Sequence, residues 1–236
     1  MDRGRLITFE GGEGCGKSTQ VRRLAERLQE LGRTVRCLRE PGGTPLGEKL
    51  RHLLKHDPDG AGMAAETELL LMNASRAELV RRVLQPALAA GEIILCDRFY
   101  DSTTAYQGHG RGLPPAEVQA IIRLAVGETC PDLTLWLQVP PEVGRARARA
   151  RAGLEPLPDR FEAEQEAFFR RVDAGYATIA AAEPGRWAAI DSQAAVEQVA
   201  AQVWQVVLGR LPELAAPSSP PADPSAAETA GTGAVG

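Results

Sequence analysis

Residues 6–19 read LITFEGGEGCGKST, and this stretch decides the fold of the chain. Its apolar start has the composition of a buried strand, and a glycine-rich loop follows. The loop ends in Lys17 and Ser18, after which a helical pattern begins at once. Residues 11–18 match G-x-x-x-x-G-K-[ST], the pattern of a phosphate-binding loop, and the strand before it and the helix after it supply the context that this pattern needs.

The residue types in this loop suit an anion. Its glycines let the backbone turn tightly, so that successive N–H groups point at a phosphate, and the N-terminus of the next helix adds partial positive charge. Lys17 supplies a charge to the outer phosphates, and the Ser18 hydroxyl can ligate Mg²⁺. Glu13 is different, because a carboxylate repels phosphates. It either points to Arg98, a metal-bound water or a hydroxyl of the acceptor, or is a solvated turn residue.

Length and composition limit the class of protein. The chain has 236 residues, 44% hydrophobic and 25% charged, which suits one globular α/β domain. A net charge of −4 gives no general electrostatic case for binding nucleic acid or a membrane surface. No apolar run approaches the ~18 residues of a membrane span, and the apolar stretch in residues 1–10 is too short for a secretion signal. We therefore expect a cytoplasmic protein.

The four cysteines are Cys15, Cys37, Cys96 and Cys130. None forms a C-x-x-C pair, and no histidine lies close to any of them in sequence. We expect buried free thiols rather than zinc ligands or disulfides.

Strand and helix patterns alternate five times. The strands are expected at 6–9, 34–38, 93–96, 133–139 and 187–190, and long helices at 64–84, ended or kinked by Pro86, and at 159–182. This predicts an α/β fold in which helices sandwich a five-stranded parallel sheet, within a domain spanning residues 1–211. Residues 145–162 are expected to form a mobile lid. From residue 212 to 236 the chain is Pro, Ala, Ser and Gly without periodicity, which predicts a disordered tail.

Polar residues follow the strands where a parallel sheet binds ligands. Asp97 ends an apolar strand, where phosphate-loop enzymes place the carboxylate that orients Mg²⁺ through water. The alternative is an ordinary aspartate that caps the next turn. Arg98 follows directly, and its guanidinium can clamp a second phosphate.

Two groups of arginines need an interpretation. Arg145, Arg147, Arg149 and Arg151 alternate with mostly small residues on an expected helix next to the lid. One of them can stabilise charge on a transferring phosphoryl group, or the four form a solvated face or an RNA-binding stripe. Arg76 stands amid apolar residues four positions after Met72. It either reads a ligand or pairs with Glu78 or Glu13, whereas Met72 alone would be interpreted as core.

Together these motifs resemble those of the thymidylate (dTMP) kinase family. The resemblance rests on FEGGEGCGKST at 9–19, REPGGT at 39–44, the helix reaching residues 75–77, CDRFYDSTTAYQGHGRGL at 96–113, and RARARA leading to DRFE at 159–162. It covers about residues 5–209. It implies a nucleoside monophosphate kinase that transfers the γ-phosphoryl group of ATP to dTMP, with Mg²⁺, and that forms a homodimer packed through helices.

The resemblance also implies roles by position. Lys17 and Ser18 would hold the ATP phosphates and the metal, with Asp97 acting on the metal through water, and Glu13 would lie near the sugar 3′-hydroxyl. Arg98 would bridge the donor and acceptor phosphates. The expected ATP-binding residues are Gly11, Gly12, Glu13, Gly14, Cys15, Gly16, Lys17, Ser18 and Thr19.

The acceptor site follows in the same way. Arg76 would read a thymine carbonyl, and the Tyr106 ring would lie under the deoxyribose, where it crowds a 2′-hydroxyl. Thr103 and Gln107 would flank the base. The expected dTMP-binding residues are Glu40, Pro41, Met72, Arg76, Arg98, Thr103, Tyr106 and Gln107.

Gly14 is not basic whereas the lid is, as in the bacterial subtype whose catalytic arginine comes from the lid. Arg149 or Arg151 is the expected residue. Two positions depart from the family pattern: Met72 stands where a phenylalanine usually stacks on thymine, and the lid is longer at 153–158.

Two rival functions remain at this stage. The acceptor can be another monophosphate, such as UMP or CMP, or the chain can be a non-catalytic nucleotide-dependent switch. The presence of Glu13, Asp97 and Arg98 argues against the switch.

Overall fold

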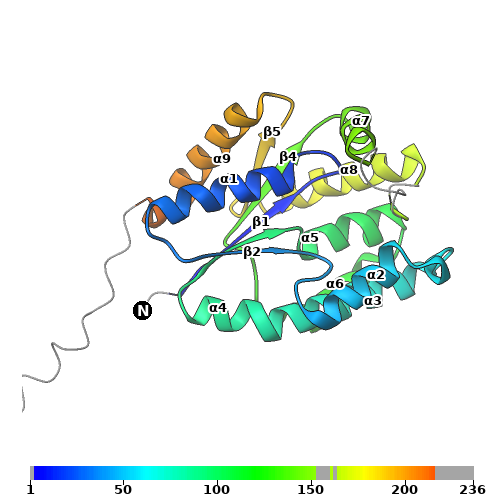
Figure 1. Ribbon diagram of the computed structural model, residues 1–236. Helices are drawn as coiled ribbons and strands as arrows, with labels where there is room; N and C mark the ends of the chain where they lie inside the picture. Colours follow the sequence, from blue (N-terminus) through cyan, green and yellow to red (C-terminus); the bar gives the residue numbers. More distant parts are fainter. Residues whose placement is uncertain (1–2, 153–159, 162–163, 216–236) are drawn as a thin grey trace, which may run out of the picture.

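The structure, a computed structural model, describes residues 3–152, 160–161 and 164–215, without the side chains of Arg149, Arg151 and Ala152. Within this part, a parallel sheet of five strands lies between two layers of helices (Figure 1), as the alternation predicts. The strand order is β2-β3-β1-β4-β5. The strands are β1 (Arg5–Glu10), β2 (Val35–Arg39), β3 (Ile93–Asp97), β4 (Leu133–Gln138) and β5 (Trp187–Asp191).

Strand β1 is central, and its register positions the site. Phe9 pairs with Asp97 on one side, and Glu10 pairs with Trp136 on the other. Because the strands are parallel, their carboxyl ends meet at one edge. The phosphate loop therefore starts beside Asp97.

Each layer of helices buries its own apolar face. On one side, α1 (Lys17–Glu30) and α9 (Val196–Arg210) pack on the sheet. On the other lie α3 (Ala65–Leu79), α4 (Gln85–Ala89) and α6 (Pro115–Val126), with α2 (Pro45–Lys55) against α3. The remaining helices are α5 (Tyr100–Thr103), α7 (Pro141–Ala152) and α8 (Glu166–Ala182), with 3-10 turns at Pro58–Gly60 and Pro212–Leu214.

Among the described residues, two segments are π-helical, Val80–Leu84 and Thr104–Gly110. The first joins α3 to α4, so the expected helix does not end near Pro86 but continues to Ala89. Pro86 lies inside this continuous helix, directly after the π-helical turn, so its missing N–H removes a hydrogen bond without ending the helix. The second π-helical segment carries Tyr106 and Gln107 at the carboxyl edge of the sheet.

Other boundaries differ from expectation. The helix predicted from 159 begins at Glu166, and residues 153–159, in the expected lid, lie outside the described residues. Pro212–Leu214 form a 3-10 turn whose Leu214 is buried in the core, so residues 212–215 belong to the packed domain rather than to the tail. Residues 216–236 lie outside the described part.

The cysteine prediction is half right. Cys15 and Cys96 are buried and free, whereas Cys37 and Cys130 are free but exposed. Cys37 lies on the edge strand β2, none of whose side chains is fully buried. Among the described helices, none is long and apolar enough to cross a membrane.

Candidate active site

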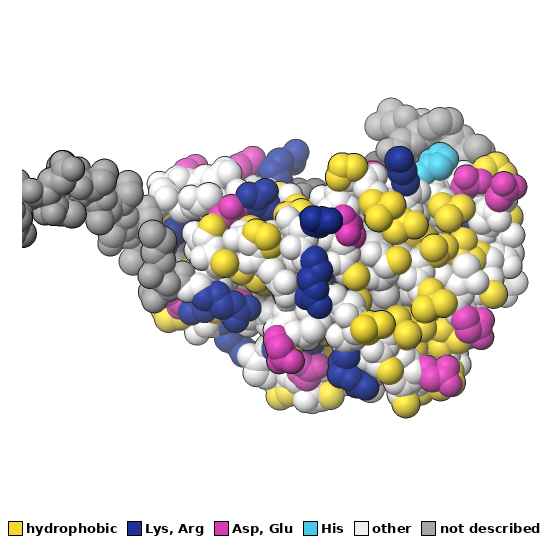
Figure 2. All heavy atoms as spheres, turned by 90° about the horizontal axis from the view of Figure 1, so that it is seen from below, with side chains coloured by type: hydrophobic (Ala, Val, Ile, Leu, Met, Phe, Trp, Pro, Cys, Tyr) yellow, Lys and Arg dark blue, Asp and Glu magenta, His cyan; other side chains and the backbone are white. Residues whose placement is uncertain are grey.

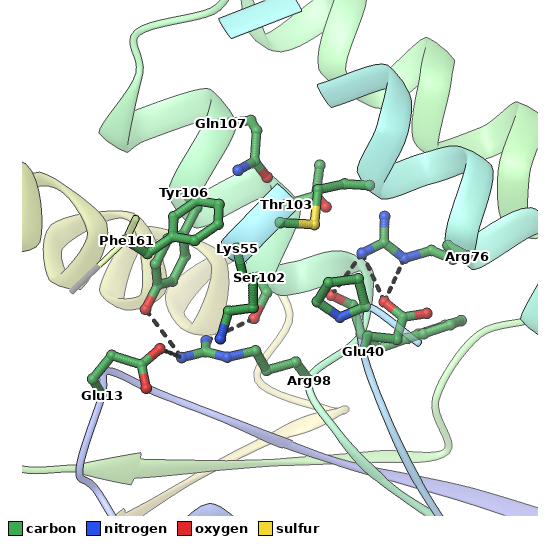
Figure 3. Close-up of a pocket in the computed structure, with 13 residues that line it drawn as sticks. Glu13, Glu40, Lys55, Arg76, Arg98, Ser102, Thr103, Tyr106, Gln107 and Phe161 are labelled. Atoms are coloured by element: carbon green, nitrogen blue, oxygen red, sulfur yellow. Dashed lines mark hydrogen bonds and ion pairs between the residues drawn. The ribbon is translucent and has the colours of Figure 1, made fainter. Parts of the chain in front are cut away.

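A pocket opens at the carboxyl edge of the sheet, between the phosphate loop, the end of α2, α3 and the segment after β3 (Figure 3). Its walls combine aromatic, acidic and basic side chains. The lining residues are Glu13, Glu40, Pro41, Lys55, Met72, Arg76, Arg98, Phe99, Ser102, Thr103, Tyr106, Gln107 and Phe161. All eight residues expected at the acceptor site are among them.

The phosphate loop leads directly into α1. Gly16, with φ 95°, caps the helix in a conformation that favours glycine. The Lys17 ammonium donates to the carbonyls of Gly12, at 2.7 Å, and Gly11, at 3.2 Å. The Ser18 hydroxyl donates to Asp97 Oδ2 at 2.6 Å, because the sheet register brings the end of β3 beside the loop. The two expected metal ligands are therefore in direct contact.

Helix α7 packs on the loop so closely that Gly14 has no room for a side chain. A Cβ at Gly14 would lie 2.0 Å from the Gly144 carbonyl oxygen, and one at Gly144 would lie 2.4 Å from the Glu13 carbonyl oxygen. Gly14 also has φ 68°. A basic side chain at position 14 is thus excluded in this arrangement, and α7 is the basic element next to the loop.

The arginines of α7 are only partly described. Arg145 forms an ion pair with Glu166 at 3.4 Å, and Arg147 donates to the Ser192 carbonyl at 2.9 Å. The side chains of Arg149 and Arg151 lie outside the described residues. The assignment of the lid arginine to one of these two therefore stays a prediction.

The Arg98 guanidinium is hydrogen-bonded to four side chains at the pocket. Its Nη2 donates to Glu13 Oε1 at 2.7 Å and to the Tyr106 hydroxyl at 3.1 Å, as Figure 3 shows. Its Nη1 donates to the hydroxyls of Ser102, at 3.0 Å, and Tyr176, at 3.1 Å. Glu13 pairs with Arg98, one of its expected partners. The guanidinium is thereby held between the loop and the pocket.

The charge of Glu13 is set by its neighbours. Burial by itself would raise its pKa, but the positive charges of Arg98, Lys17 and Lys55 outweigh burial and lower the pKa to about 2. Glu13 therefore stays ionised at neutral pH.

Arg76 lies deep in the pocket, and its expected pairing with Glu78 or Glu13 is wrong. Its Nε and Nη2 contact Glu40 Oε2 at 2.8 and 2.7 Å, with both side chains 3% exposed. Its Nη1 donates to Asn73 Oδ1 at 2.7 Å. Burial raises the pKa of Glu40, and the Arg76 charge opposes that rise. A buried pair of this kind holds the guanidinium in one place at the pocket wall.

The far end of the pocket is organised by a buried carboxylate that the sequence did not reveal. Glu68 is fully buried and accepts a hydrogen bond from Gln107 Nε2 at 2.7 Å. Arg111 and Arg160 contact the same carboxylate at 3.0 and 2.6 Å. The Gln107 amide is therefore oriented, and Arg160, which falls within the expected lid (145–162), is tied to the same carboxylate.

Sequence reasoning missed Lys55, Phe99, Ser102 and Phe161 as site residues. Phe161 packs edge-on against Tyr106 and also lines the pocket. Lys55, the last residue of α2, points into the pocket beside Arg98 (Figure 3). A lysine at a helix end is so common that the sequence carried no signal for it.

Three comparisons bear on the family. A family model described as thymidylate kinase matches residues 9–203. A thymidylate kinase of Synechococcus sp. (strain JA-2-3B'a(2-13)) is 52% identical over 207 residues, 88% of this chain and 96% of that one. One of Rhodopseudomonas palustris (strain BisB18) is 50% identical over 211 residues, 89% and 90% of the two chains. A crystal structure of thymidylate kinase from Ehrlichia chaffeensis matches with TM-score 0.70 and 32% identity, over 87% of this chain and 99% of that one.

Proposed function

The chain belongs to the thymidylate kinase family, and we propose that its phosphate loop and its pocket hold ATP and dTMP end to end. The chain is an ATP-dependent kinase that phosphorylates dTMP to dTDP, a step toward dTTP. One observation carries the residue assignment. Arg98 touches Glu13 of the loop and Tyr106 of the pocket with one nitrogen, so a single cation reaches both nucleotide sites.

The donor site is the loop from Gly11 to Thr19. Its N–H groups and the N-terminus of α1 bind the ATP phosphates, and the Lys17 ammonium moves from the loop carbonyls to the outer phosphates. Ser18 and Asp97 fit Mg²⁺, since a hydroxyl and a carboxylate 2.6 Å apart are hard oxygen donors, and Asp97 acts through water. When bound, Mg²⁺ neutralises charge on the transferring phosphate.

The acceptor site is the pocket around Arg76 and Tyr106. The thymine lies against Met72, with Arg76, Thr103 and Gln107 at its polar edges. Tyr106 lies under the deoxyribose and crowds a ribose 2′-hydroxyl. Glu40 and Pro41 form the wall behind Arg76, and Glu40 keeps its guanidinium in place.

The acceptor phosphate lies near Arg98 and Lys55. Both cations border the pocket, and Lys55 is close enough to lower the pKa of Glu13. A phosphate oxygen is already a good nucleophile, so no strong general base is needed. The rate enhancement comes from positioning the two anions and neutralising the charge between them. Arg149 or Arg151 adds a further cation when the lid closes.

A second copy of this chain covers an apolar face. Leu46 on α2, Leu70 on α3 and Leu124 on α6 are 51%, 54% and 78% exposed, and these helices pack side by side. Figure 2 shows hydrophobic side chains gathered over one half of the face seen from below. Apolar area of this kind is typical of an interface. We therefore assign a homodimer packed through these helices.

The proposed function is tested by comparing four nucleoside monophosphates as phosphoryl acceptors, which we call the acceptor panel. ADP release is measured with dTMP, dUMP, UMP and CMP under saturating ATP and Mg²⁺. dTMP should give the highest kcat/KM. A higher value with UMP or CMP would contradict the acceptor assignment, and tight ATP binding without any acceptor-dependent ADP release would support a nucleotide-dependent switch instead.

A further inference from the structure

Glu10 is a fully buried carboxylate that the mechanism above does not use. It is the last residue of β1, directly before the phosphate loop, and it is 0% exposed. Its Oε1 accepts from the Phe99 N–H at 2.8 Å. Its Oε2 accepts from the Ser102 hydroxyl at 2.6 Å and from the Tyr176 hydroxyl at 3.0 Å. A buried carboxylate is costly unless such contacts compensate it, so this placement needs an explanation.

The two hydroxyls that donate to Glu10 also contact Arg98. Arg98 Nη1 lies 3.0 Å from Ser102 Oγ and 3.1 Å from Tyr176 Oη. A guanidinium can only donate, so both hydroxyl oxygens must accept from Arg98. Each hydroxyl has one hydrogen to donate, and Glu10, when ionised above its pKa of about 7, can only accept. The hydrogens therefore point from Arg98 through the hydroxyls to Glu10.

The backbone of the same segment is held from the other side. Arg98 has φ 71°, which is uncommon for a residue with a side chain and costs on the order of 1 kcal/mol. The Arg98 N–H donates to the Phe9 carbonyl at 3.0 Å, and the next N–H, that of Phe99, donates to Glu10. Glu10 thus holds the backbone directly after Arg98 and, through the two hydroxyls, the guanidinium of Arg98 as well.

From this geometry we propose that Glu10 is a positioning residue for Arg98. By accepting both hydroxyl hydrogens, it turns the oxygens of Ser102 and Tyr176 toward Arg98 and holds the guanidinium where the two phosphates meet. Glu10 touches neither nucleotide. The proposal rests on the role assigned to Arg98 above.

The pKa of Tyr176 supports this direction of the hydrogen bonds, from Arg98 through the hydroxyls to Glu10. Burial, followed by the nearby charge of Glu10, raises the pKa of Tyr176 well above its usual value, so its hydroxyl keeps its hydrogen and remains a donor to Glu10. The Ser102 and Tyr176 oxygens also lie 2.9 Å apart, a hydrogen bond in which one hydroxyl shares its hydrogen between Glu10 and the other oxygen, so the two hydroxyls are held together beside Nη1.

Glu10→Gln tests the proposal because it keeps size and hydrogen-bonding capacity but introduces an N–H₂ donor that competes with Arg98 for the hydroxyl oxygens. We expect kcat to fall by on the order of 10- to 100-fold, since small displacements of a positioned group have this effect. KM for ATP should change by less than about twofold, because the phosphate loop is untouched.

A double-mutant cycle between Glu10→Gln and the pair Ser102→Ala/Tyr176→Phe distinguishes a positioning role of Glu10 from a purely structural one. This double variant should lose about as much kcat as E10Q, and E10Q added to it should lower kcat by less than about threefold more, since the groups act as one unit. Glu128→Gln, on an exposed turn, controls for the loss of a charge. Thermal unfolding confirms that each variant is folded.

Two results would overturn the proposal. One is a folded E10Q protein, or a folded Ser102→Ala/Tyr176→Phe protein, with kcat within about twofold of the wild type. The other is a fall in kcat on Glu10→Gln that is equally large in the wild type and in the Ser102→Ala/Tyr176→Phe variant. If E10Q does not fold, the double variant alone decides. If the acceptor panel favours another monophosphate, the cycle is run with that acceptor, so failure of the dTMP assignment stays distinguishable.

Discussion

Arg98 Nη2 lies 2.7 Å from Glu13 Oε1, which joins the segment after β3 to the phosphate loop across the top of the pocket. The two side chains are 14% and 20% exposed, so the pair faces both nucleotide sites while remaining largely shielded from water. A cation in this position can leave its carboxylate partner to meet developing negative charge.

Arg98→Ala should therefore lower kcat/KM for dTMP by on the order of 1,000-fold, because it removes a cation aimed at the transferring phosphate. Arg98→Lys keeps the charge but loses the planar fork that meets four partners at once, so it should recover only part of the rate. Steady-state kinetics with unfolding controls measure both. Near-normal turnover by pure, folded Arg98→Ala protein would refute the assignment.

Lys55→Met should raise KM for dTMP by about three- to tenfold with little change in KM for ATP, since a partly exposed cation contributes modestly to anion binding. Lys49→Met is the matched control, because Lys49 lies on the same helix but is exposed and does not line the pocket. Binding of thymidine, which lacks the phosphate, should be unchanged in both variants. An equal loss of thymidine binding in Lys55→Met would assign Lys55 to the nucleoside instead.

Met72→Phe should lower KM for dTMP by about two- to tenfold, because an aromatic ring stacks on thymine better than a thioether does. Met72 lines the pocket and packs against the aromatic cluster around Tyr106, so a ring there meets the base. Thr67→Phe, at an exposed position of the same helix that does not line the pocket, is the control and should leave KM unchanged. If Met72→Phe instead raises KM, the pocket at this position is already filled and the base lies elsewhere.

The sheet was predictable because its signal is local. The apolar run before the loop, the glycines at 11–16 and the alternation of helices with strands each depend on near neighbours in sequence. The acceptor residues came from the family motifs, and the structure gathers all of them in one pocket. The edge position of β2, which exposes Cys37, depends on the strand order and could not be read from the residues alone.

Pairings between distant residues could not be predicted. The partner of Arg76, Glu40, lies 36 positions away, and the residues around Glu10 lie 89 to 166 positions away. Charge alone suggested Glu78 or Glu13 for Arg76, because nothing local distinguishes one carboxylate from another. Only the fold decides which carboxylate is buried beside the guanidinium.

Leu124→Glu should convert a dimer to a monomer, because it places a charge in the proposed interface on a side chain that is 78% exposed in the single chain. The fold of one copy should be unaffected for the same reason. Val196→Glu, at a 41% exposed position on α9, is the matched control and should leave the assembly unchanged. Sedimentation at several concentrations measures the mass. A wild-type monomer, or a Leu124→Glu dimer, would contradict the assigned face.

The last prediction concerns the stability of the fold against pH. Burial raises the pKa of Glu10 from 4.5 to about 7; the charge of Asp101 adds to this rise, and Arg98 opposes it. The titratable and charged groups around Glu10 are Asp101 on α5, Arg98 and Cys96 at the end of β3, and Tyr176 on α8. Between pH 4.5 and 7 the folded state then binds more protons at Glu10 than the unfolded state does. The contribution of Glu10 to the free energy of unfolding is therefore fully present below pH 4.5 and is lost as the pH rises through 7. The loss should amount to on the order of 1–3 kcal/mol.

Because glutamine does not titrate, E10Q should gain stability relative to the wild type between pH 5 and pH 8, while its kcat stays low. Urea unfolding of both proteins at pH 5, 6, 7 and 8 measures the difference, and Glu128→Gln should run parallel to the wild type. A difference between E10Q and the wild type that stays constant across this range would show that Glu10 is ionised throughout.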